Sequence, residues 1–222
     1  ALFCPYVQSY PSLVKTALDL HGIDTSNMLT PVMDLRWREK RQVRELLEAV
    51  GERLGKNRKQ IAKAWHAGLK AQDEFDEACR AAGREFLDNV DKEGQPAVLI
   101  LGRPYNTCDS GINLGLVRKI AERGHTVIPL DFMPFDPAEL DGVYSNVFWN
   151  YHQRIIHAAL QTRESDRIFP VYFTNFNCGP DSFIEPYPEH LAGEKPMLIL
   201  GLDEHDADAG YITRIEAFLD VI

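Results

Sequence analysis

The chain has 222 residues, of which 45% are hydrophobic and 26% are charged, as in an ordinary globular protein with a buried core. A formal net charge of −9 argues against a dedicated nucleic-acid-binding protein. No apolar stretch is long enough to cross a bilayer, and no signal-peptide pattern opens the chain. We therefore expect a cytoplasmic protein that has no membrane partner.

Near the amino terminus, "LFCPYVQSYP" places Cys4 directly before a proline. Cys-Pro is a common context for iron–sulfur ligands, because the proline fixes the turn and removes a competing donor, although the dipeptide alone does not specify a cluster. Pro11 and Ser12 are then expected to open a short helix that ends at Leu20.

The next part of the chain has helical periodicity. Apolar residues recur at helical spacing from Val43 to Leu54, and Asn57 is suited to cap a second helix that runs to about Val90. Along this helix one face forms a seam, whose residues follow one another at alternating spacings of four and three positions: Ile61, Trp65, Gly68, Gln72, Phe75, Cys79, Ala82 and Phe86. We interpret Cys79 and Trp65 as packing residues of that seam.

A basic stretch covers the same helices. Between Arg36 and Lys70 there are eleven Lys or Arg residues against four Asp or Glu residues. The stretch is either a solvated helical face or a docking surface for an acidic partner or an anionic substrate.

The pattern changes after a predicted linker at 91–96. Four buried-type runs alternate with helical stretches: "AVLIL" (97–101), "HTVIPL" (125–130), "RIFPVYF" (167–173) and "PMLIL" (196–200). Continuous apolar strands separated by helices predict a parallel sheet with helices on both faces. The fold class is therefore α/β, with a Cys loop and long-helix region at 1–95 and a Rossmann-like or flavodoxin-like domain of about four strands at 96–222.

Ligands of such sheets bind beyond the carboxyl ends of the strands, where three distinctive loops fall: "GRPYNTCDSG", "TNFNCGPDSF" and "GLDEHDADAG". In the first loop Gly102 provides a tight strand exit, and Arg103, Tyr105 and Asn106 provide donors. The loop is neither a Walker loop nor a GxGxxG motif. Arg103 is either a surface charge or an anion clamp.

The second loop places Cys178 just before Gly-Pro-Asp-Ser, where Pro180 suits the first turn of a helix. A thiol in that setting is either a half-buried cysteine or a thiolate that serves as a nucleophile or metal ligand. Asn177 lies beside it and could contribute a backbone amide. In the third loop several carboxylates precede a helix. We expect Asp206 and Asp208 to cap that helix, with His205 as a supporting or proton-handling group.

Taken together, "CPYVQSYP", "ILGRPYN", "NVFWNYHQRIIHAA", "TNFNCGPDSFI" and "LDEHDADAGYITRIEAFLD" resemble the uncharacterised domain of CoA-substrate-specific enzyme activase proteins. That domain is akin to the iron–sulfur subunits of 2-hydroxyacyl-CoA dehydratases and to double-cubane-cluster proteins. The resemblance implies the carboxyl-terminal portion of an electron-transfer component. An ATP-hydrolysing activase domain or subunit would reduce it, an acyl-CoA would be its substrate, and a homodimer is compatible with it.

By this resemblance Cys4 and Cys178 are the ligands of an iron–sulfur cluster, either 4Fe–4S or double cubane. The surrounding cofactor-binding positions are Arg103, Tyr105, Asn106, Asn177 and His205. The family pattern tends to show glycine where His152 stands and an acidic residue where Gly201 stands. The alternative is a metal-free CoA-binding or nucleotide-binding module, or a regulatory or structural module, of a larger activase protein.

Overall fold

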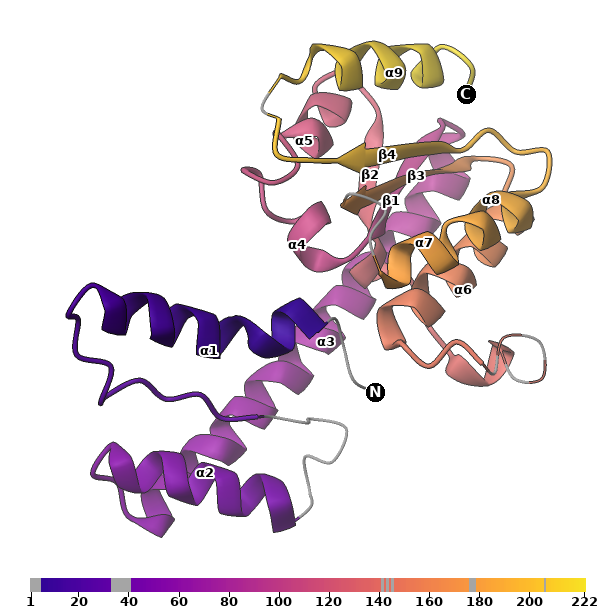
Figure 1. Cartoon of the computed structure of the whole chain (residues 1–222). Coiled ribbons are helices and arrows are strands. Elements are labelled where there is room, and N and C mark those ends of the chain that lie inside the picture. The colour runs from indigo at the N-terminus through magenta and orange to yellow at the C-terminus, as the bar shows by residue number, and fades with distance from the viewer. Residues whose placement is uncertain are drawn as a thin grey trace. The chain divides into compact units, whose positions relative to one another are not determined.

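The computed structural model describes residues 5–32, 41–140, 142, 144, 146–175, 179–205 and 207–222 (Figure 1). The chain divides into two compact units, Ala1–Asp76 and Glu77–Ile222, and each is described here by itself. Within the described residues, no helix combines the length and the apolar character that a bilayer span requires.

The first unit holds α1 (Pro5–Leu20), α2 (Arg41–Arg53) and the beginning of α3 (Arg58–Glu93). The prediction that the first helix opens at Pro11 is wrong: α1 begins at Pro5, which takes the first-turn position, and Pro11 lies inside the helix. The predicted cap of α3 is confirmed. Asn57 and Gln60 exchange backbone-to-side-chain hydrogen bonds of 3.0 Å in both directions, which satisfies two amides at the helix start.

The apolar seam of α3 is not one continuous core. Cys79 is buried, as predicted, but Phe75 is 61% exposed. Further along, Phe86, Leu87 and Val90 pack into the core of the second unit. The boundary between the units falls inside α3, so the two parts of the helix have different packing partners and the seam is interrupted between them.

The second unit is built on a parallel four-stranded sheet, which confirms the predicted fold class. Its strands are β1 (Ala97–Gly102), β2 (Thr126–Pro129), β3 (Ile168–Asn175) and β4 (Leu198–Leu202), in the order β2-β1-β3-β4. All six residues of β1 are buried, because this strand is central and covered on both faces. Parallel pairing places Gly102 opposite Phe173 at the carboxyl end of the central pair.

Helices cover both faces of the sheet, as the alternation of strands and helices predicts (Figure 1). On one face Leu99 and Leu101 belong to the core that includes the end of α3, α6 (Asn150–Glu164) and α8 (Pro186–Ala192). On the other face Val98 and Ile100 pack with α5 (Leu116–Ala121) and α9 (Ala209–Leu219). The remaining short elements are α4 (Pro104–Thr107), η2 (Leu130–Phe132), η3 (Pro137–Leu140) and α7 (Pro180–Ile184).

Candidate functional site

The candidate site begins where β1 ends. Gly102 has φ +146°, and a Cβ atom there would lie 2.7 Å from the carbonyl oxygen of Phe173 on β3. A side chain would therefore meet the neighbouring strand in a backbone conformation that L-residues rarely adopt. Glycine is therefore required at the end of β1, because β1 and β3 approach each other closely there, as the predicted tight turn at Gly102 implies.

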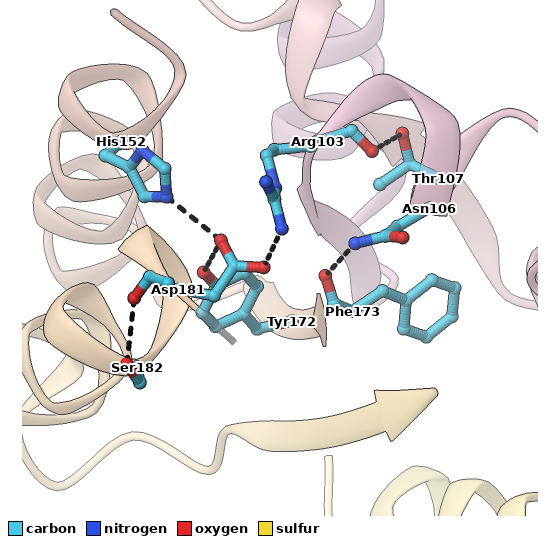
Figure 2. Close-up of polar contacts among 9 residues, drawn as sticks. Arg103, Asn106, Thr107, His152, Tyr172, Phe173, Asp181 and Ser182 are labelled. Atoms are coloured by element: carbon cyan, nitrogen blue, oxygen red, sulfur yellow. Dashed lines mark hydrogen bonds and ion pairs between the residues drawn. The ribbon is translucent and has the colours of Figure 1, made fainter. Parts of the chain in front are cut away.

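Hydrogen bonds order the loop after β1 and join it to β3. The carbonyl oxygen of Arg103 accepts hydrogen bonds from the backbone amides of Asn106 (2.8 Å) and Thr107 (3.1 Å). Asn106 is fully buried, and its Nδ2 donates to the carbonyl oxygen of Phe173 at 3.4 Å. Two of the predicted residues, Arg103 and Asn106, consequently lie at the carboxyl end of the central strand pair (Figure 2).

Arg103 forms a buried ion pair. Its Nη2 lies 2.6 Å from Oδ2 of Asp181 on α7, and the two side chains are 7% and 1% exposed. The interpretation of Arg103 as a surface charge is therefore wrong. An incoming anion would have to compete with Asp181 for the guanidinium. Tyr105 also contacts this group, with its ring centroid 4.7 Å from the Arg103 Cζ atom, and is 40% exposed.

Asp181 is the centre of a hydrogen-bond network (Figure 2). Its Oδ1 lies 2.9 Å from Nε2 of His152 on α6 and accepts a 3.4 Å hydrogen bond from the Tyr172 hydroxyl on β3. An ionised carboxylate can only accept, so the His152 Nε2 carries a proton. Among the described residues the buried His152 Nδ1 has no hydrogen-bond partner, and Trp149 packs against the ring with centroids 5.4 Å apart. The network therefore joins β3, α6, α7 and the loop after β1 through buried side chains.

Burial governs the ionisation of the groups around Asp181. It raises the pKa of the Tyr172 hydroxyl far above its usual range, and the negative charge of Asp181 acts in the same direction. Tyr172 thus remains a neutral donor. Burial, followed by the charges of Glu189 and Asp181, also raises the pKa of Glu185 at the end of α7. Both shifts follow from burial beside the negative charge of Asp181.

The loop after β3 contains two predicted residues, Asn177 and Cys178, that lie outside the described residues, as does Cys4. Both flanks of this loop are described: Asn175 ends β3, and Gly179, with φ +54° and ψ −126°, precedes α7. The predicted helix start at Pro180 is confirmed. Asp181 follows Cys178 by three positions, so the buried network holds the carboxyl-terminal flank of this loop.

The loop after β4 is exposed. Asp203, Glu204 and His205 present potential ligand atoms within 4.8 Å of one another, and the His205 Nδ1 lies 3.1 Å from Oδ2 of Asp203. Hydrogen bonds from the His205 backbone and side chain lower the pKa of Asp203. The order β1-β3-β4 puts β3 between this loop and that of Arg103. Exposed acidic groups of this kind do not by themselves identify a metal site.

The predicted capping role of Asp208 is wrong. Asp208 occupies the position before α9, but its side chain makes no capping hydrogen bond there. It forms an ion pair with Lys119 instead, and hydrogen bonding to Lys119 lowers the pKa of the carboxyl group. A strong cation nearby competes successfully with the neutral backbone amides. Asp206, the other predicted cap, lies outside the described residues.

Sequence reasoning missed the centre of the network. The pattern around Asp181 predicts only a helix start, and that around Tyr172 only an apolar strand. The signal for Asp181 was its place in the first turn after a strand at the ligand-binding edge. The remaining thiols are Cys79, which is buried, and Cys108, which is exposed at the end of α4.

A family model described as the CoA enzyme activase uncharacterised domain (DUF2229) matches residues 1–133. This match covers the first unit, β1, the Arg103 loop and β2, and it ends before α6, α7 and the loop of Cys178. Comparison with the curated proteins found no match. Comparison with the solved structures found none either.

Proposed function

Because the chain belongs to the family of the CoA enzyme activase uncharacterised domain, we propose that it is an iron–sulfur electron-transfer component. It would act in an ATP-driven 2-hydroxyacyl-CoA dehydratase-like or reductase system. Cys178 and Cys4 would each supply a thiolate to a 4Fe–4S or double-cubane cluster. The observation that carries the proposal is the buried Asp181 network, which anchors the flank of the Cys178 loop at the ligand-binding edge.

Cys4 and Cys178 have the ligand type that an iron–sulfur cluster needs, but not the full number of ligands. Thiolates are the ligands that iron–sulfur clusters use. Two thiolates are half of the four ligands that a cubane usually takes. The proposal therefore requires further ligands from a second copy of this chain or from another polypeptide segment, which is compatible with a homodimer.

When bound, the cluster would supply a one-electron carrier. The protein groups have simpler tasks. Arg103, His152 and Tyr172 hold Asp181, and Asp181 holds the start of α7, which follows the loop. Asn106 fixes the adjoining loop to β3. Backbone amides at Asn177 and Gly179 would donate to the ligand sulfurs, and such donors tune the potential of a cluster.

The exposed polar groups on the neighbouring loops are the proposed contact points for other molecules. Tyr105 is 40% exposed beside Arg103, and His205 is exposed on the loop after β4. We assign them to the surface that meets an acyl-CoA substrate. The ATP-hydrolysing activase would approach the same edge, because electron transfer needs a short path from donor to cluster.

Anaerobic reconstitution with iron and sulfide tests the proposal. The wild-type chain, with and without an added activase, is compared with Cys178→Ala, Cys4→Ala and Cys108→Ala. We expect broad visible absorption and bound iron in wild type and in Cys108→Ala, and a loss of most of both in the other two variants. Circular dichroism checks that each variant is folded.

Equal iron content in wild type and Cys178→Ala would overturn the cluster assignment. In that case thermal-shift measurements with CoA esters and nucleotides under metal-free conditions distinguish the alternative binding module. A rise in the melting temperature with these ligands would favour that module.

A further inference from the structure

A second site lies in the first unit, between α2 and α3. A cavity of about 680 Å³ opens there, and all the described residues that line it come from these two helices. The helices approach closely near their connection, where Gly51 lies against the side chain of Ile61.

The floor of the groove is apolar and follows helical spacing. On α3 it is formed by Ile61, Trp65 and Leu69, which recur every four residues over two turns, and on α2 by Leu47. All four side chains are only partly buried. Two helix faces that converge in this way present the surface that a third, amphipathic helix would cover with residues spaced three and four apart.

The rim of the groove is basic. Arg44, Arg58 and Lys59 line it and are exposed, whereas Glu48 is the one acidic residue among the described lining residues and lies 3.4 Å from Arg58. The formal charge of the lining is therefore +3 − 1 = +2, in a chain whose net charge is −9. The groove is thus positively charged in an acidic chain, which favours an acidic ligand. Part of the basic stretch between Arg36 and Lys70 lies on its rim.

The described residues of the first unit bury little apolar surface. Among its described residues, Val43 is the one hydrophobic side chain in the buried set, at 4% exposure. On α1, the large side chains of Tyr6 and Tyr10 are 81% and 65% exposed, so α1 does not provide a closed core for the unit. A groove whose apolar side chains are only partly buried gains stability when a partner covers it.

We propose that the α2–α3 groove binds an acidic amphipathic helix of a partner protein. Apolar side chains of that helix would pack on Trp65 and its neighbours, and its Glu or Asp residues would face Arg44, Arg58 and Lys59. An extended anion such as a nucleic acid is disfavoured by the acidic chain. The inference does not depend on iron–sulfur binding, because its residues are separate from Cys4 and Cys178.

Fluorescence anisotropy of a labelled peptide tests the proposal with the full chain. The probe is an amphipathic peptide of about 15 residues, with Leu at positions three and four apart and Glu elsewhere. We expect saturable binding that weakens about tenfold or more in Trp65→Ala, as for an aromatic anchor in an interface. Binding should also weaken in Arg44→Glu and lose part of its salt dependence there.

Two controls separate groove binding from general attraction. A scrambled peptide of the same composition keeps the charge but has no apolar face. Lys63→Glu makes the same charge change on α3 at a residue that does not line the groove. The proposal predicts little binding of the scrambled peptide and an unchanged affinity for the Lys63→Glu variant.

Three results would overturn the inference: no binding of the acidic peptide up to about 1 mM, equal binding of the scrambled peptide, or equal losses in Lys63→Glu and Arg44→Glu. Trp65-dependent binding of a nucleotide or CoA ester that displaces the peptide would also overturn it, because the groove would then be a small-molecule site. Circular dichroism of each variant excludes unfolding as the cause of a loss.

Discussion

The Arg103 guanidinium and the Asp181 carboxylate lie 2.6 Å apart, although they are 78 positions apart in the sequence. Both side chains are almost completely buried. Taking two charges out of water is costly, so such a pair contributes little net stability, but removing one member leaves the other charge buried without its counter-ion. The pair therefore acts chiefly to fix α7 and the Cys178 flank against the loop after β1.

The first prediction concerns this pair. Asp181→Ala should lower the free energy of unfolding by about 3–5 kcal/mol, because the Arg103 charge stays buried without this carboxylate. The double variant Arg103→Met, Asp181→Ala should recover part of the loss, since it removes the unpaired Arg103 charge as well. Urea denaturation measures both values.

An exposed pair provides the control. Arg118 and Glu122 lie 3.6 Å apart with side chains 76% and 60% exposed, so Arg118→Ala should change the free energy of unfolding by less than about 1 kcal/mol. A similarly small effect of Asp181→Ala would contradict the buried network.

The second prediction compares two buried histidines of α6. His152 bonds to the buried Asp181, whereas the Nε2 of His157 lies 2.7 Å from Oε2 of Glu139, whose side chain is 64% exposed. Replacing either histidine with Ala leaves a cavity. In the His152 variant the buried Asp181 carboxylate also loses a hydrogen-bond donor, whereas water can replace the donor that the exposed Glu139 loses in the His157 variant. His152→Ala should therefore cost about 1–2 kcal/mol more than His157→Ala in chemical denaturation. Equal losses would show that the hydrogen bond to Asp181 contributes little.

The third prediction concerns the pH dependence of stability. The pKa of Glu185 is raised in the folded protein by burial and by neighbouring carboxylates. A carboxyl group whose pKa is higher in the folded than in the unfolded protein stabilises the folded state in its protonated form. As the pH rises from the unfolded pKa, near 4.3, through the folded pKa, the group ionises and this contribution to stability is lost. Glu185→Gln should therefore be more stable than wild type at pH 7, and the difference should vanish below about pH 4.

Thermal unfolding across this pH range measures the effect. Glu194→Gln, at an exposed position, serves as the control and should show little pH-dependent difference. A Glu185→Gln variant that is less stable than wild type at pH 7 would reverse the expected sign.

The fourth prediction uses two glycines of α3. A Cβ atom at Gly83 would overlap the carbonyl oxygen of Phe132, whereas one at Gly68 would have no non-local neighbour within 4 Å among the described residues. Gly83→Ala should cost about 1–3 kcal/mol through overpacking. Gly68→Ala should stabilise the helix by about 0.5–1 kcal/mol through its higher helix propensity. Melting curves followed by far-UV circular dichroism should shift in opposite directions for the two variants.

The strands could be predicted from the sequence because the signal is local. A strand buried on both faces needs a continuous apolar run, and each of the four runs became a strand of the parallel sheet. The reciprocal hydrogen bonds of Asn57 and Gln60 are equally local. The start of α1 was predicted wrongly because Pro5 and Pro11 both suit a first turn, and the residues do not decide between them.

The sequence by itself determined the strands, the helices that cover them, and the three polar loops at one edge, because these depend on neighbouring residues. Only the tertiary structure decided what the polar residues do there. β2 lies between β1 and β3 in the sequence but at the edge of the sheet, so β1 and β3 are spatial neighbours. That strand order, set by packing on both faces, brings Arg103 to Asp181, and no spacing along the chain encodes it.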